Sequence, residues 1–142
     1  MSPVKKITRH TIRNEEIPAF MFLGIVSAEP DYRLSVLLNK HLGSDFRKDA
    51  EEITTGSGKG KNSFSCFLSA RPAYKMVANK NGEAVLMRRL GKIDFLLAIG
   101  GPSDRKRSED LATMIRKIAE VTAVFVFDSR EANDRNVSLL AL

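Results

Sequence analysis

The pattern of hydrophobic and polar positions predicts two strand and helix units, one near the N-terminus and one over residues 93–128. In the second unit, apolar residues first alternate as in a strand, then recur at helical spacing after a Gly-Gly-Pro break, and finally form another strand-like run. These positions are Ile93, Phe95, Leu97 and Ile99, then Leu111, Ile115 and Ile118, then residues 122–127. The sequence therefore predicts strand, helix and strand in this order.

The first unit opens with a run that begins at Phe20 and ends at Val26 and is apolar on both faces. This pattern is typical of a strand covered from two directions, so we expect it to be central in a sheet or buried by a partner. Glu29 and Pro30 fit the start of a helix, because proline at the first helical position gives up no intrahelical donor. Its apolar stripe is Leu34, Leu37, Leu38 and Leu42, and Gly43 is a natural stop.

The middle of the chain predicts a long loop followed by an antiparallel meander. Residues 44–62 carry acids first and then a run of glycine, serine, threonine and lysine, which is typical of a flexible loop. Strand-like runs follow at 64–70, 74–79 and 83–87, and Asn81 with Gly82 is a strong hairpin signal between the last two. In the second helix we expect Ser108 to be the N-cap, with Glu109 and Asp110 in the first turn.

These elements predict an α+β fold in the order β-α-β-β-β-β-α-β. We expect an antiparallel or mixed sheet of about six strands with both helices on one face, in a ferredoxin-like or regulatory-domain-like arrangement. A chain of 142 residues suits a single domain, with a polar N-terminal arm at 1–16 and a C-terminal tail at 129–142. The apolar end of this tail, from Val137 to Leu142, must dock on its own domain or on another chain.

The net charge of +6 raises the question of nucleic-acid binding. The basic residues that would serve it are Lys59, Lys61, Arg88, Arg89 and Lys92. Single-strand binders usually add aromatic platforms, but the chain has only two tyrosines, and its eight phenylalanines mostly occupy core-like positions. A solvated basic surface is therefore the favoured interpretation, and a nucleic-acid site is the alternative.

Other features bear on cellular location. No apolar run approaches the roughly 20 residues of a membrane span, and residues 1–16 lack the apolar centre of a signal peptide. The single cysteine, Cys66, excludes an intramolecular disulfide and alternates with Phe64 and Leu68 as a core thiol would. We expect a cytoplasmic protein that does not bind a membrane.

Candidate chemistry is limited to anion binding. Residues 56–61 superficially resemble a phosphate-binding loop but lack its spacing and its following helix, so a flexible linker is favoured. A better candidate is the turn before the second helix, where backbone donors and arginines could bind an anion. Such a turn also needs glycine for backbone reasons alone, so a purely structural turn is the other interpretation. Its residues are Gly100, Gly101, Ser103, Arg105, Lys106 and Arg107. We expect no catalytic residue, no metal site and no cofactor.

Ile93, Asp94 and Phe95 match the second half of a known family signature. The segment that contains them resembles a degenerate copy of the signature of the IPExxxVDY family, a group of small uncharacterised bacterial proteins. Met87, Arg88 and Arg89 stand where that pattern has isoleucine, proline and glutamate. Further similarities lie at 31–34, Leu37, Leu38, Asn39, Ala78 and Asn79. The resemblance spans residues 17–128 and implies a compact cytoplasmic bacterial protein, but no established activity.

Two classes of function follow from the sequence. The first is a non-catalytic α+β module that forms a homo-oligomer through the strand from Phe20 to Val26 or through the tail from Val137 to Leu142, and that binds a small anionic ligand. The second is a nucleic-acid or ribonucleoprotein-associated protein that uses its basic residues. An enzyme is a third option, which would require convergent polar groups in a deep pocket.

Overall fold

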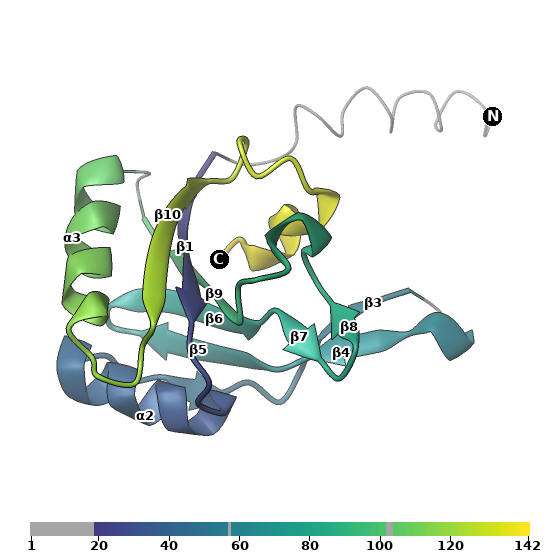
Figure 1. The fold of residues 1–142 in the computed structure, drawn as a ribbon, viewed down its shortest axis with the longest axis horizontal. Helices are drawn as coiled ribbons and strands as arrows, with labels where there is room; N and C mark the ends of the chain where they lie inside the picture. The colour runs from purple at the N-terminus through teal and green to yellow at the C-terminus, as the bar shows by residue number, and fades with distance from the viewer. Residues whose placement is uncertain (1–18, 57, 102–103) are drawn as a thin grey trace.

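A six-stranded antiparallel sheet forms the centre of the computed structural model, which describes residues 19–56, 58–101 and 104–142 (Figure 1). Its strands are β1 (Met21–Val26), β2 (Arg47–Lys48), β5 (Cys66–Ala70), β6 (Ala73–Ala78), β9 (Phe95–Ile99) and β10 (Ala123–Asp128). They lie in the order β10-β1-β9-β6-β5-β2, and every neighbouring pair is antiparallel. The predicted α+β class is confirmed, whereas the ferredoxin-like assignment stays a prediction.

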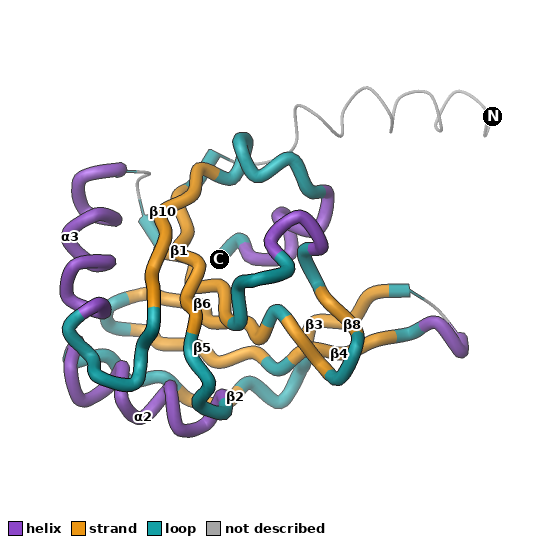
Figure 2. The backbone as a smooth tube through the Cα atoms, in the orientation of Figure 1, coloured by secondary structure: helices purple, strands orange, loops and turns teal. Residues whose placement is uncertain are grey.

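Two helices, α2 (Asp31–Leu42) and α3 (Arg105–Arg116), pack on one face of this sheet (Figures 1 and 2). The apolar stripe of α2 and that of α3 share one hydrophobic core with the inward side chains of the strands. Leu34, Leu38 and Ile115 are fully buried there, against strand residues such as Leu23 and Leu97. The helical spacing in the sequence therefore predicted the correct buried faces.

The opposite face of the sheet is covered by irregular segments from the second half of the chain (Figure 1). These include the 3-10 helices η2 (Arg88–Leu90) and η3 (Arg135–Leu140), which accompany a second core. Val137 and Leu140 of the tail are fully buried in it, and Lys75 Nζ donates to the carbonyls of Leu139 and Ala141 at 2.9 and 3.3 Å. The tail therefore docks on its own chain.

Strand β1 lies between β9 and β10 and is buried on both faces, as the sequence predicted for a central strand. Its apolar character and that of the tail are thus explained by contacts within one chain. Self-association through either segment stays a prediction.

The stretch 44–62 differs from the expected uninterrupted loop. It contains β2 and a hairpin of β3 (Ile53–Thr55) and β4 (Asn62–Phe64), with the short 3-10 helix η1 (Gly58–Gly60) near the tip. Ile53 lies opposite Phe64, and both contribute to the second core. The glycine and lysine run is therefore only the tip of a hairpin whose base is held by apolar contacts.

The three strands expected to form one meander are distributed over three sheets. Ser65 separates β4 from β5, so the predicted strand 64–70 belongs to two sheets. The third predicted strand does not join the main sheet but forms a small hairpin of β7 (Lys80–Asn81) and β8 (Ala84–Val85). Gly82 has a φ of 62° in this turn, which is why the Asn-Gly signal located the hairpin correctly.

Helix boundaries correct two further expectations. Pro30 is the N-cap of α2 rather than its first residue, while Gly43 ends the helix with a φ of 69°, as predicted. Helix α3 begins earlier than expected, because the carboxylate of Asp104 accepts hydrogen bonds from the N–H groups of Lys106 and Arg107. Ser108 therefore lies inside the helix, where its hydroxyl donates to the carbonyl of Asp104.

Gly24 in β1 allows close packing on the face of the second core. A Cβ at this position would lie 2.8 Å from Phe127 Cε2 and 3.0 Å from Ile93 Cδ1. We expect Gly24→Ala to lower the free energy of unfolding by about 1–3 kcal/mol through overpacking. Gly60→Ala is the control in urea denaturation, since a Cβ there meets nothing within 4 Å. Equal effects of the two substitutions would contradict this account.

Asp45 connects the end of α2 to the β5–β6 turn. Its carboxylate accepts hydrogen bonds from the Ser69 hydroxyl at 2.7 Å and the Ala70 N–H at 2.9 Å. The Ser69 hydroxyl first, and then the N–H groups of Ala70 and Arg71, hold the pKa of Asp45 below its ordinary value of 3.8.

A carboxyl group with a lowered pKa in the folded state stabilises the protein above its unfolded pKa and loses this contribution as pH falls through the folded value. We therefore expect Asp45→Asn to be less stable than the parent near neutral pH. The difference in the free energy of unfolding should shrink as the pH falls below 3.8. Urea denaturation at a series of pH values measures this, and a difference independent of pH would contradict it.

Candidate functional site

The sequence predicted an anion site in the turn before α3, but the basic side chains of this turn already have partners within the chain. Arg107 Nη1 donates to the carbonyl of Gly100 at 3.0 Å, and Lys106 pairs with Asp110 at 3.2 Å. Arg105 lies 3.6 Å from a carboxylate oxygen of Glu131. Gly101 has a φ of 87°, a conformation that glycine adopts readily, so the turn has a structural reason for this residue.

A carboxylate also stands where an anion would bind at the N-terminus of α3. Asp104 accepts from the first backbone donors of the helix, as described above. Ser103, another predicted site residue, lies outside the described residues. Anion binding at this turn stays a prediction, but it would have to compete with the protein's own groups.

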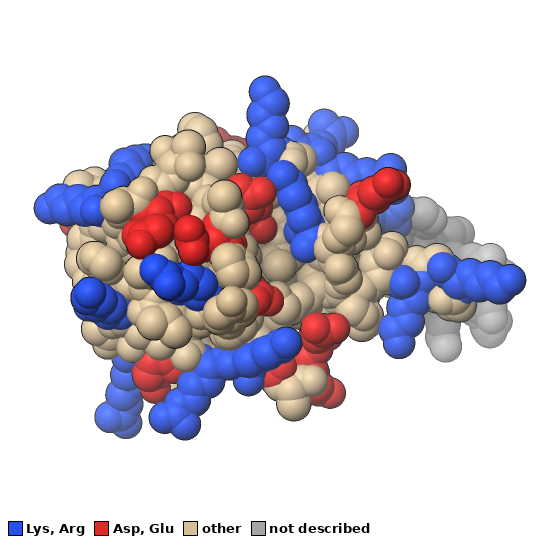
Figure 3. Space-filling view, turned by 60° about the horizontal axis from the view of Figure 1, so that its bottom comes forward, with Lys and Arg blue, Asp and Glu red and all other residues tan. Residues whose placement is uncertain are grey.

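The basic residues proposed for nucleic acid are separated by the fold into different places. Arg88 and Arg89 lie together on η2, while Lys59 lies on η1 and Lys61 just before β4. Lys92 lies between η2 and β9. Figure 3 shows acidic and basic side chains interspersed over one face, with Lys and Arg prominent on the projecting β3–β4 hairpin. On this face the charge is mixed.

Arg88 and Arg89 line a groove together with a third arginine, Arg135. We name it the arginine groove; it has a volume of about 500 Å³, and its walls include Thr55 and Asn62 from the β3–β4 hairpin. All three arginines are exposed. The groove thus joins three segments that are far apart in the sequence.

The docked tail places Arg135 in this groove. Asn136 Nδ2 donates to the carbonyl of Leu86 at 2.7 Å, which fastens the start of η3 to the segment that leads into η2. The carboxylate of Asp134 accepts the N–H of Asn136 at 2.9 Å, and Val137 is buried next to them. Arg135 therefore lines the same groove as Arg88 and Arg89 because the tail is anchored directly after it, at Asn136 and Val137.

The charges of the arginine groove favour an anion. Within the described residues, none of the three arginines has an ion pair with a carboxylate. Asp134 is the acid in the lining, and one of its oxygens caps η3. Three positive charges against one negative leave a surplus of two, and guanidinium groups can grip phosphate or carboxylate through two parallel hydrogen bonds.

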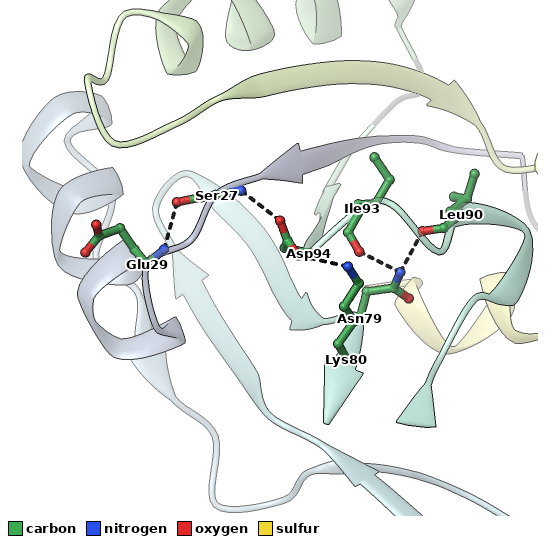
Figure 4. A network of polar contacts seen from close by, with 7 residues as sticks. All are labelled: Ser27, Glu29, Asn79, Lys80, Leu90, Ile93 and Asp94. Atoms are coloured by element: carbon green, nitrogen blue, oxygen red, sulfur yellow. Dashed lines mark hydrogen bonds and ion pairs between the residues drawn. The ribbon is translucent and has the colours of Figure 1, made fainter. Parts of the chain in front are cut away.

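Asn79 holds the segment that carries two of these arginines (Figure 4). This fully buried amide donates from Nδ2 to the carbonyls of Leu90 and Ile93, at 2.9 Å each. Its Oδ1 accepts the N–H of Met87 at 2.8 Å. Met87 and Leu90 flank Arg88 and Arg89, so this side chain holds η2 together with the backbone bond from the Leu90 N–H to the Met87 carbonyl.

The neighbouring carboxylate, Asp94, ties three elements together on the other side of Asn79 (Figure 4). Asp94 Oδ2 accepts the N–H of Ser27 at 3.0 Å, and Oδ1 lies 3.1 Å from Lys80 Nζ. The hydroxyl of Ser27 accepts the N–H of Glu29 and donates to the carbonyl of Glu120. Asp94 thus links the end of β1 to β7.

The sequence did not single out Arg135 and Asn136, which it placed in the C-terminal tail without a role of their own. No local pattern links them to η2, since their proximity arises from the docking of the tail. Asn79 entered the sequence analysis as the end of a predicted strand and as part of the family resemblance, without a structural role. A buried asparagine beside a hairpin turn has no periodic signal of its own, because its role depends on carbonyls supplied by a later loop.

Other chemistry finds little support in the part of the chain that the structure describes. Cys66 is buried, as predicted, and burial raises the pKa of its thiol, which favours the unreactive protonated form. Among residues 19–56, 58–101 and 104–142, no three His, Cys, Asp or Glu side chains are placed to hold a metal ion. None of the helices in these ranges has the length and apolar character needed to cross a membrane.

The fold defines the class of protein: an α+β protein with a six-stranded antiparallel sheet. No family model and no curated protein matches the chain. The resemblance to the IPExxxVDY family therefore stays a prediction.

We expect Asn79→Ala to destabilise the fold by about 2–4 kcal/mol, because the Met87 N–H and two carbonyls lose their partner in a buried place. Asn62→Ala is the matched control, since this amide is exposed and donates to Gly60 in its own hairpin. Urea denaturation of both variants measures the difference. A loss as small as that of the control would refute the role of Asn79.

Proposed function

We propose that this protein is a non-catalytic α+β module that binds a small phosphate-bearing ligand in the arginine groove. The observation that carries this proposal is the convergence of Arg88, Arg89 and Arg135 on one groove, without a carboxylate partner among the described residues. Unpaired guanidinium groups that converge in a hollow are typical of phosphate recognition.

The lining of the groove adds uncharged groups that suit the same ligand. Thr55 offers a hydroxyl, and Asn62, Asn133 and Asn136 offer amides, although the amide of Asn62 already donates to Gly60 and that of Asn136 to Leu86. Such groups can bond the ester or sugar oxygens that accompany a phosphate. The groove therefore supports an anionic ligand better than the turn before α3, where the arginines and lysine already have partners.

The groove gives no positive indication of catalysis. Among the described residues, its lining contains no cysteine, histidine or lysine, and the one acid there, Asp134, is engaged as the cap of η3. A pair of groups that could transfer a proton is a usual requirement of acid and base catalysis. Binding without chemistry is therefore the proposal that these residues support.

Nucleic acid is the second candidate, and one observation favours it. The β3–β4 hairpin contributes Thr55 and Asn62 to the groove and carries Lys59 and Lys61 near its tip, so a phosphate chain could continue along it. Against it, none of the described residues that line the groove is aromatic, and base stacking usually provides much of the affinity for single strands. A small ligand is therefore preferred.

Titration calorimetry with inorganic pyrophosphate tests the proposal. We expect saturable binding to the parent protein, and we expect Arg89→Gln or Arg135→Gln to weaken it roughly tenfold each, because each removes a charged hydrogen-bond donor. Arg47→Gln on β2 is the matched control, since it removes the same charge from a residue outside the groove lining and should leave binding unchanged.

Two results would contradict the proposal. Equal weakening by Arg47→Gln would mean that the pyrophosphate responds to total charge rather than to the groove. A single-stranded oligonucleotide that binds much more tightly than pyrophosphate, with an affinity that falls steeply with salt and depends on Lys59 and Lys61, would replace the small ligand by nucleic acid.

A further inference from the structure

The end of the chain, residues 133–142, is attached to the rest of the protein without main-chain pairing. We call it the end segment; it contains η3 and lies against β6 and β9 on the face of the second core (Figure 1). Within the described residues, no hydrogen bond between backbone groups joins the end segment to another part of the chain. Segments without such bonds open at a lower free energy than the inner strands of a sheet. The end segment can therefore open while the sheet stays intact.

Side chains attach the end segment instead. Lys75 Nζ on β6 donates to the carbonyls of Leu139 and Ala141, at 2.9 and 3.3 Å. Val137 and Leu140 are fully buried among residues of the second core. A ligand that binds only when these contacts are formed adds its binding free energy to them.

The end segment also builds part of the arginine groove. Four of the described residues that line the groove belong to it, namely Asn133, Asp134, Arg135 and Asn136. The others come from the β3–β4 hairpin and from the stretch between β8 and η2. Opening of the end segment would therefore remove one of the three arginines and one side of the groove.

Charge opposes the docking of the end segment when no anion is bound. Docking places Arg135 in the same groove as Arg88 and Arg89, and within the described residues none of the three has an ion pair with a carboxylate. Like charges brought together repel one another, although solvent and salt weaken the effect at exposed positions. A phosphate group that contacts arginines of both segments replaces this repulsion with charged hydrogen bonds. Such an anion stabilises the docked end segment and not the open one.

We propose that the ligand of the arginine groove controls the docking of the end segment. This inference rests on the proposed binding of a phosphate-bearing ligand and adds a regulatory role to that site. Ligand binding holds the end segment against the second core, and ligand release lets it open and uncover the apolar surface beneath Val137 and Leu140. By linkage, binding and docking favour each other by the same free energy.

Amide hydrogen exchange of the full chain, measured by NMR with and without inorganic pyrophosphate, tests this coupling. The N–H groups of Val137 and Ala141 are bonded to carbonyls within the end segment. With pyrophosphate at about ten times its dissociation constant, we expect both amides to exchange roughly tenfold more slowly, because the open form that exchanges has lost the site. The amides of Leu34 and Gly43 in the first turn and at the C-terminal end of α2, on the other face of the sheet, are the reference and should not change.

A variant outside the groove lining tests the docking itself. Lys75→Met removes both hydrogen bonds to the carbonyls of the end segment, so Val137 and Ala141 should exchange roughly fivefold faster without pyrophosphate. Saturating pyrophosphate should slow this exchange again. Lys106→Met is the matched control, since this lysine pairs with Asp110 on α3, and it should leave the exchange of the end segment unchanged.

The coupling and the proposed function can fail separately. Calorimetric binding of pyrophosphate without slower exchange in the end segment would overturn the coupling and leave the proposed function intact. Equal slowing in the end segment and in α2 would also overturn it, because the ligand would then stabilise the whole fold rather than the docking. An effect of Lys106→Met as large as that of Lys75→Met would contradict the attachment by Lys75. Absence of pyrophosphate binding would overturn the coupling together with the proposed function.

Discussion

Strand β1 requires apolar cover on both of its faces, and most of the molecule is arranged around this requirement. Helices α2 and α3 cover one face, while η2, η3 and the loops beside them cover the other (Figure 1). Burial of apolar surface is the dominant favourable contribution to folding, so segments without regular structure are recruited for the second face. Arg88, Arg89 and Arg135 lie on these segments, and the arginine groove therefore depends on the packing of the second core.

A few buried polar side chains give the irregular segments a single conformation. Asn79 bonds the backbone on both sides of η2, and Asn136 bonds the tail to Leu86. In a buried place an unpaired amide or carbonyl is costly, so such bonds select one arrangement of the loop from many. Stability and the proposed binding site thus depend on the same contacts, and mutations of Asn79 would be expected to affect both.

The two hollows carry opposite surpluses of charge, which the net charge of +6 conceals. Among the described residues, the arginine groove has three bases and one acid in its lining. A second hollow, lined by Ser27, Asp94 and Phe95 among others, has four acids and two bases. Segments 87–94 contribute to both, since Arg88 and Arg89 precede Asp94 by only a few residues. The segment that resembles the IPExxxVDY signature thus contributes side chains to the lining of both hollows.

The amino-acid sequence by itself determined several regular elements, because periodicity and turn chemistry are local properties. These elements are the doubly apolar strand β1, the helices α2 and α3 with their apolar stripes, and the Asn-Gly hairpin. The sequence did not determine the hairpin at 53–64, because the contact of Ile53 with Phe64 spans a segment rich in glycine and lysine that locally is typical of a loop. Nor did it determine the cap of α3, where Asp104 took the place expected of Ser108. Only the tertiary structure decided that Arg135 stands beside Arg88, because the docking of the tail brings together residues that no local pattern relates.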